Sequence, residues 1–237
     1  MIEHGMIRLN AIFAAPGLRL GLLVLMAALA AATPGRGQQF SAELMRTLAG
    51  STDGNAAPAG QLRVSGDKVR IESPDFPDGF FLIDGTKPAA YFVRPAQGVY
   101  MDARQSTALT RLFVPVDPDN PCRQWQTMAA IAGLPEQGDW HCELVAAETI
   151  EARETIVYRA TPAAGHAFTG WIDRIRKFPL RIKTDDGAVV TAASIRDEQQ
   201  AAVLFELPKG ARKFDPQALI ERIKQSDVWV AAPDPAP

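Results

Sequence analysis

The feature that most constrains the fold is an alternation of apolar and polar side chains along short segments of the chain. The clearest case is residues 61–72, where polar residues separate the apolar ones on both sides of a Gly–Asp pair: Leu62, Val64, Val69 and Ile71. Because successive side chains of a strand point to opposite faces of a sheet, each arm of this segment has one apolar face. The segment therefore predicts a β-hairpin that turns at Gly66 and Asp67.

Short segments of similar strand character recur at hairpin spacing through most of the chain. They cover residues 80–84, 90–94, 98–102, 142–147, 154–160, 168–175, 180–184, 189–196 and 203–207, with a strong turn signal at 185–187. Several of them precede any long helical pattern, as expected for strands that tight turns join into an antiparallel sheet. The sequence therefore predicts an α+β fold that is mostly β.

Three segments have helical character instead. Residues 38–50 carry apolar side chains at spacing i, i+4, i+5 and i+8, which predicts a short amphipathic helix capped by Ser41. Residues 123–132 predict a second short helix. Asp215 followed by Pro216 predicts the capped start of a last helix, whose apolar face would consist of Leu219, Ile220 and Ile223.

Residues 1–37 have the layout of a secretory signal peptide. A basic residue, Arg8, precedes an apolar run at residues 21–32 that ends in small residues. A membrane span needs about 20 apolar residues, and Pro16 and Arg19 interrupt any longer run. We therefore expect export to the periplasm, cleavage between the end of this run and Gln38, and no stable membrane span afterwards. An uncleaved anchor is the alternative.

The rest of the chain is expected to form one domain, residues 38–230, followed by a disordered tail at residues 231–237. Without residues 1–37 the chain keeps 22 of its 25 basic and 26 of its 27 acidic side chains, a net charge of −4. This overall balance favours neither nucleic acid nor an anionic membrane surface as a partner.

Only two cysteines occur, Cys122 and Cys142. In an oxidising compartment they are expected to form a disulfide, which closes a loop of about 20 residues and stabilises the fold by about 3 kcal/mol in the chain-entropy model. The alternative is a metal site that adds His141 and Glu143. Adjacent residues of an extended segment point to opposite faces, which argues against that site.

The sequence contains none of the motifs that mark common catalytic or cofactor sites, such as Gly-x-Ser-x-Gly, His-Glu-x-x-His, the Walker loop or Gly-x-Gly-x-x-Gly. We therefore assign no catalytic residue, no metal and no cofactor, and we expect a protein that is not an enzyme. A hydrolase that uses His141 or His166 with an acidic partner is the least favoured alternative.

The order of the segments resembles the periplasmic lipoprotein-carrier superfamily, that of LolA and LolB and their uncharacterised relatives. The resemblance covers most of residues 40–214 and rests on an opening hairpin, on strands that contain aromatic residues and on late Trp, Pro-Leu and Phe segments: 60–72, 81–85, 91–93, 99–101, 171–173, 179–182 and 204–210. It implies an unclosed antiparallel β-barrel, a curved sheet with a few helices on its concave side. The segment 117–142 and the last helix depart from the carrier pattern.

A concave sheet of this kind has more apolar surface than two short helices cover, so we expect it to bind an apolar ligand. Such a ligand would be an acyl chain, a lipid or a lipoprotein segment. The candidate lining residues are Leu62, Val64, Phe81, Tyr91, Trp171 and Phe205. The tryptophans are expected to pack in the core more often than to line a pocket. The alternative function is an envelope protein-interaction module with a filled core, whose partner is another envelope protein.

Overall fold

The structure is a computed structural model, and it describes residues 38–50, 56–133, 139–163 and 165–225. All of these residues belong to the second of two compact units, residues 37–237. The predicted signal peptide and the predicted C-terminal tail lie outside the described residues.

Twelve strands form one sheet in the described part of the chain, in the spatial order β12-β6-β5-β4-β3-β2-β1-β11-β10-β9-β8-β7. Their bounds are β1 (Gln39–Thr47), β2 (Ala57–Ser65), β3 (Lys68–Glu72), β4 (Phe80–Asp84), β5 (Ala89–Arg94), β6 (Val99–Asp102), β7 (His141–Ile150), β8 (Arg153–Thr161), β9 (Phe168–Asp173), β10 (Phe178–Thr184), β11 (Val189–Asp197) and β12 (Arg212–Lys213). Only β12 and β6 pair in parallel. Because β7 and β12 are separate edges, the sheet is an unclosed barrel, which confirms the predicted fold class.

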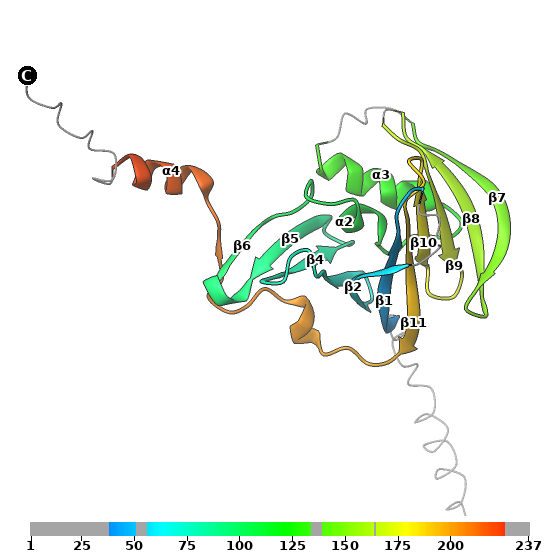
Figure 1. The fold of residues 1–237 in the computed structure, drawn as a ribbon, viewed down its shortest axis with the longest axis horizontal. Helices are drawn as coiled ribbons and strands as arrows, with labels where there is room; N and C mark the ends of the chain where they lie inside the picture. The colour runs from blue at the N-terminus through cyan, green and yellow to red at the C-terminus, as the bar shows by residue number, and fades with distance from the viewer. Residues whose placement is uncertain (1–37, 51–55, 134–138, 164, 226–237) are drawn as a thin grey trace, which may run out of the picture. The chain divides into compact units, whose positions relative to one another are not determined.

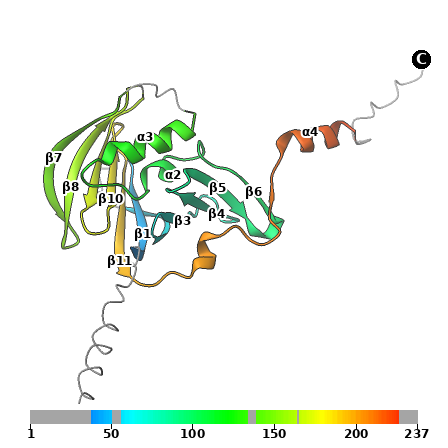
Figure 2. The ribbon, with the colours of Figure 1, turned by 180° about the vertical axis from the view of Figure 1, so that it is seen from behind.

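Two meanders of strands meet at β1. Strands β2 to β6 follow one another outward from one side of β1, while β7 to β11 return so that β11 pairs with its other side. Figures 1 and 2 show α2 (Leu109–Leu112) and α3 (Pro121–Ile131) lying between these two wings of the sheet. Helix α4 (Pro216–Lys224) follows β12, and two 3-10 turns, η1 and η2, span Pro95–Gln97 and Ala202–Phe205.

The helix predicted at residues 38–50 is wrong, because this segment is strand β1. Phe40, Ala42 and Leu44 are buried on one face, as a period of two requires. The spacing was ambiguous, since residues four apart share a face in a strand as well as in a helix. Pairing with β2 on one side and β11 on the other stabilises the extended form.

Other sequence predictions are confirmed. The hairpin of residues 61–72 is β2 and β3, with Val64 opposite Val69. The last helix is α4, and the Asp215 side chain accepts hydrogen bonds from two backbone N–H groups of its first turn, at 2.9 and 3.1 Å. The disulfide between Cys122 and Cys142 joins α3 to the edge strand β7.

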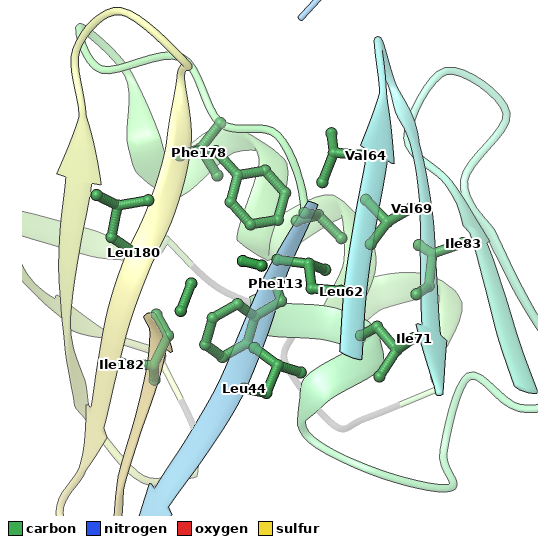
Figure 3. Packing of buried hydrophobic residues seen from close by; sticks show 14 of the residues in the cluster. Leu44, Leu62, Val64, Val69, Ile71, Ile83, Phe113, Phe178, Leu180 and Ile182 are labelled. Atoms are coloured by element: carbon green, nitrogen blue, oxygen red, sulfur yellow. The ribbon is translucent and has the colours of Figure 1, made fainter. Parts of the chain in front are cut away.

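The main core lies on the face of the sheet that α2 and α3 cover, which we call the concave face. Figure 3 shows side chains from both wings meeting there, with Phe113 and Phe178 between them. Phe113 directly follows α2, so the chain that connects the two meanders supplies part of the filling. The residues labelled in the figure are Leu44, Leu62, Val64, Val69, Ile71, Ile83, Phe113, Phe178, Leu180 and Ile182.

Candidate functional site

Two cavities lie on the concave face, one on each side of α2. The first has a volume of about 430 Å³ and lies between α2, α3 and the start of β9. The second has a volume of about 280 Å³ and lies between α2, β4 and β10. They have four lining residues in common: Ala108, Leu112, Thr184 and Asp186. Together they form an adjoining pair of apolar spaces of the size that small ligands occupy.

The walls of both cavities are largely aliphatic and aromatic. The first is lined by Leu112, Trp125, Ala129, Trp140, Pro162, Ala167 and Phe168 among others. The second is lined by Ala59, Phe76, Phe81, Leu109, Phe113, Ile182, Ala188 and Val190 among others. Both lists contain several alanines, and small side chains leave unfilled volume where a curved sheet faces a short helix.

Trp125 fixes the inner wall of the first cavity. Its indole N–H donates a hydrogen bond of 3.1 Å to the carbonyl of Leu112, which links α3 to the end of α2. Its ring packs edge-to-face on Phe168, with the centroids 4.9 Å apart. The absence of a side chain at Gly170 makes room for it, because a Cβ there would lie 2.7 Å from the indole. The wall is therefore built from α3 and β9 together.

Charged side chains gather at the rim of the two cavities. Arg111, His166, Asp185 and Asp186 line the first, and Arg46, Asp75 and Asp186 line the second. The Thr184 hydroxyl donates to Asp186 and, with the Ala188 backbone N–H and the nearby His166, lowers the pKa of that carboxyl. Asp186 is therefore ionised at neutral pH, and the apolar interior is bordered by groups of both signs.

Three of the six predicted lining residues lie on the concave face. Phe81 lines the second cavity. Leu62 and Val64 are 0% and 1% exposed and lie in the filled part of the core, away from both cavities. A guest in the cavities would contact Phe81 and not these two.

The other three predicted lining residues lie on the opposite, convex face. Tyr91 pairs with Leu82 and packs edge-to-face on Tyr100, whereas its neighbour Phe92 is the residue opposite Phe81. Trp171 donates to Glu148 at 2.7 Å and lies under the guanidinium of Arg181. Phe205 lies against the outer side of the β2–β3 hairpin. Their apolar character suggested the core, but for Tyr91 and Trp171 a shift of one residue along the strand reverses the face. The strand predicted at residues 203–207 is wrong, because Phe205 lies in the 3-10 turn η2.

The sequence did not identify most of the residues that line the cavities. Leu112 lies in a helix of four residues, which has no detectable periodicity. Trp125 is buried in the core and Trp140 packs against it, as expected, and both also line the first cavity. Their positions inside the disulfide loop were the available signal, because that loop carries α3 onto the concave face.

The two histidines of the hydrolase alternative belong to different segments, His141 to strand β7 and His166 to the connection between β8 and β9. His141 is exposed at the start of the edge strand β7, while His166 lies at the rim of the first cavity. Among the described residues, no group of three or more His, Cys, Asp or Glu side chains is arranged to hold a metal ion. Within the same residues, no helix is both long enough and apolar enough to cross a membrane.

The structure is a half-barrel with two adjoining apolar cavities under its helices. No protein-family profile matches the chain, and no curated protein matches its sequence. Solved structures that resemble it include a LolA superfamily protein from Nitrosomonas europaea, with 12% identity, a TM-score of 0.33 and coverage of 73% of this chain and 91% of that one.

Two further solved structures that resemble this chain belong to longer proteins, and the chain covers only a part of each. The complex of MucA and MucB from Pseudomonas aeruginosa matches with 14% identity, a TM-score of 0.40 and coverage of 75% of this chain and 58% of that one. PNGF-II matches with 11% identity, a TM-score of 0.47 and 79% coverage of this chain, which spans only about a third of the length of PNGF-II (33%). At this similarity the matches concern general architecture alone.

Proposed function

We propose that this is a periplasmic binding protein that holds an acyl chain in the two cavities on either side of α2. The supporting observation is the pair of adjoining cavities with apolar walls, about 430 and 280 Å³, which meet at Ala108 and Leu112. Binding would be driven by removing the chain of the ligand from water, and the charged rim would stay in contact with solvent. Export to the periplasm rests on the predicted signal peptide.

The shape of the site favours a long flexible guest over a compact one. The two cavities are separated by a helix of only four residues, and the shared residues continue from one cavity to the other. A chain with many rotatable bonds can follow such a bent path, whereas a rigid ring system of the same volume cannot. The rim carries both Arg111 and Asp186, so the polar end of the ligand would meet charges of both signs.

The test is a titration of the delipidated protein with a fluorescent fatty acid whose emission rises when it leaves water. The informative variant is Ala108→Trp, because Ala108 is exposed and lines both cavities, so an indole there fills their junction without cutting into the core. We expect saturable binding to the natural protein and a loss of affinity of about tenfold or more in the variant, as for a blocked apolar pocket.

The matched control is Ala202→Trp, which adds the same side chain at an exposed alanine of η2, away from both cavities. This variant should bind the probe as the natural protein does. Absence of saturable binding by the natural protein would remove the proposal, and equal affinity of the Ala108→Trp variant would move the ligand away from α2.

A second candidate function, binding of another envelope protein, is favoured by the edge strand β7. This strand of ten residues pairs on one side only, with β8, and exposes Leu144 and Val145 at 62% and 56%. Unpaired backbone groups on an edge strand can accept a strand from a partner. The bulge at Val145 and the charges of Glu143 and Glu148 oppose that pairing. Recovery of a partner protein with β7 protected from hydrogen exchange would favour this function over acyl binding.

A further inference from the structure

The turn between β9 and β10 exposes an apolar side chain at the end of a rigid hairpin. Ile175 is 83% exposed, the highest value among the exposed large apolar side chains of the described residues. A single exposed apolar residue is ordinary on a protein surface and needs no function by itself. The surroundings of Ile175 distinguish it from such a residue.

Several polar contacts hold the turn in one conformation. Asp173 is 2% exposed, and its carboxylate accepts hydrogen bonds from the backbone N–H groups of Ile175 and Arg176, at 2.8 and 3.0 Å. The guanidinium of Arg176 binds Asp173 at 2.7 Å and also binds Asp197 on β11. The backbone N–H of Val116 donates to the carbonyl of Lys177 at 2.8 Å. The exposure of Ile175 is thus a fixed feature of the fold.

The side chains that flank Ile175 are basic and exposed. We call Arg174, Ile175 and Lys177 the β9–β10 tip. The nearest carboxylates, those of Asp173 and Asp197, are occupied by Arg176, which leaves the two positive charges of the tip facing solvent. The net charge of the domain is negative, so attraction to an anionic surface would be local to this tip and would depend on its orientation.

The folded domain begins beside the same tip. The side-chain amide of Gln38 donates a hydrogen bond to the carbonyl of Ile175. Five residues separate Gln38 from Ala32, the last residue of the apolar run at 21–32. A chain of this length reaches at most about 20 Å. If the predicted apolar run enters a membrane, during export or as a retained anchor, the short connection limits how far Gln38 can lie from the end of that run.

We propose that the β9–β10 tip is a docking site for a membrane surface that contains anionic phospholipid. Ile175 enters the interface between head groups and acyl chains, and Arg174 and Lys177 contact lipid phosphates. This inference is independent of the acyl-binding proposal, because Thr184 and Asp186, at the rim of the cavities, lie at the opposite end of β10 from the tip. Figure 1 shows the turn between β9 and β10 and the start of β1 at the same end of the sheet.

The experiment places a polarity-sensitive fluorophore at the tip. The chain has only two cysteines and both are in the disulfide, so Ile175→Cys provides one site for labelling the protein recovered from the periplasm. The control is Leu48→Cys, because Leu48 is 62% exposed and follows the other end of β1 from Gln38. Each labelled protein is mixed with vesicles of phosphatidylcholine, alone or with equimolar phosphatidylglycerol.

The label at residue 175 should shift to shorter wavelength with the vesicles that contain phosphatidylglycerol, while the label at residue 48 should not change. Adding Arg174→Glu and Lys177→Glu should weaken the vesicle affinity about tenfold or more. Each basic residue near an anionic surface contributes favourably to membrane binding, and both contributions would be lost. No shift at residue 175, or an equal shift at residue 48, would overturn the proposal. Capture of a protein by the tip, with no response to vesicles, would also overturn it.

Discussion

The two ends of the concave face differ in how the space under the helices is used. At the filled end, Phe40 of β1 and Phe178 of β10 pack edge-to-face with their ring centroids 5.3 Å apart, and Phe178 also packs at 6.4 Å on Phe113, which borders the second cavity. At the hollow end, alanines such as Ala59, Ala108 and Ala129 face the two cavities. The same curved sheet is thus solid where aromatic residues meet and empty where small ones do, so binding space is set by side-chain volume.

The largest expected effect is at the filled end. Phe178 is 0% exposed and packs on both Phe40 and Phe113. Phe178→Ala should lower the free energy of unfolding by about 3–5 kcal/mol, because it removes a buried ring and leaves a void that its neighbours cannot close. Urea denaturation measures this loss. A loss below about 1 kcal/mol would mean that the filled end is as loosely packed as the hollow end.

The disulfide should affect both the stability of the fold and the binding of the fatty-acid probe. Replacing Cys122 and Cys142 by serine opens a loop of about 20 residues, which costs about 3 kcal/mol of unfolding free energy in the chain-entropy model. Because Trp125 and Trp140 lie within the loop and line the first cavity, the double variant should also bind the fatty-acid probe more weakly. Unchanged probe binding in a destabilised variant would mean that the wall of the first cavity does not depend on the disulfide.

A truncation at the hollow end should cost less stability and more binding. Leu112 is half-buried and lines both cavities. Leu112→Ala should lower the unfolding free energy by only about 1–2 kcal/mol, since part of the removed surface already faces open space. It should still weaken the binding of the fatty-acid probe, whereas Phe178→Ala should leave probe affinity nearly unchanged in the folded protein. The reverse pattern would place the ligand at the filled end.

The smallest effect is a dependence on pH at the filled end. The hydrogen bond from Arg176 holds the pKa of Asp197 below its ordinary value, and Arg176 also stacks over Phe40. A carboxylate whose pKa is lowered by folding stabilises the fold above its unfolded pKa and loses that contribution as the pH falls through the folded pKa. Asp197 is largely exposed, so the contribution should be below about 1 kcal/mol and weaker in salt. Asp197→Asn should make the acid unfolding curve less steep below pH of about 4.

The sheet could be predicted from the sequence more fully than the site. Alternation in residues 61–72 fixed a hairpin whose register the structure confirms, and the order of segments indicated an unclosed barrel. Strand β1 was missed because Phe40 and Leu44 are four residues apart, a spacing that fits a helix as well as a strand. Its true conformation depends on β11, which is remote in sequence.

The site was less predictable because it depends on which alternate residues of each strand face the concave side. Phe81 was placed on the correct face, but Tyr91 was not, although both lie in neighbouring strands with continuous apolar runs. Where adjacent residues are all apolar, the sequence does not indicate which of them face the concave side. The cavities depend in addition on what α2 and α3 leave unfilled, and that is a property of packing in three dimensions.

The pairing of β1 with β11 has a consequence for how the chain folds. Phe40 lies opposite Asp197, 157 residues further along, so one side of the first strand has no neighbour until strand β11 is in place. Contacts so distant in sequence form late. Until this pair forms, the two wings of the sheet are not joined and their apolar interior stays open to water.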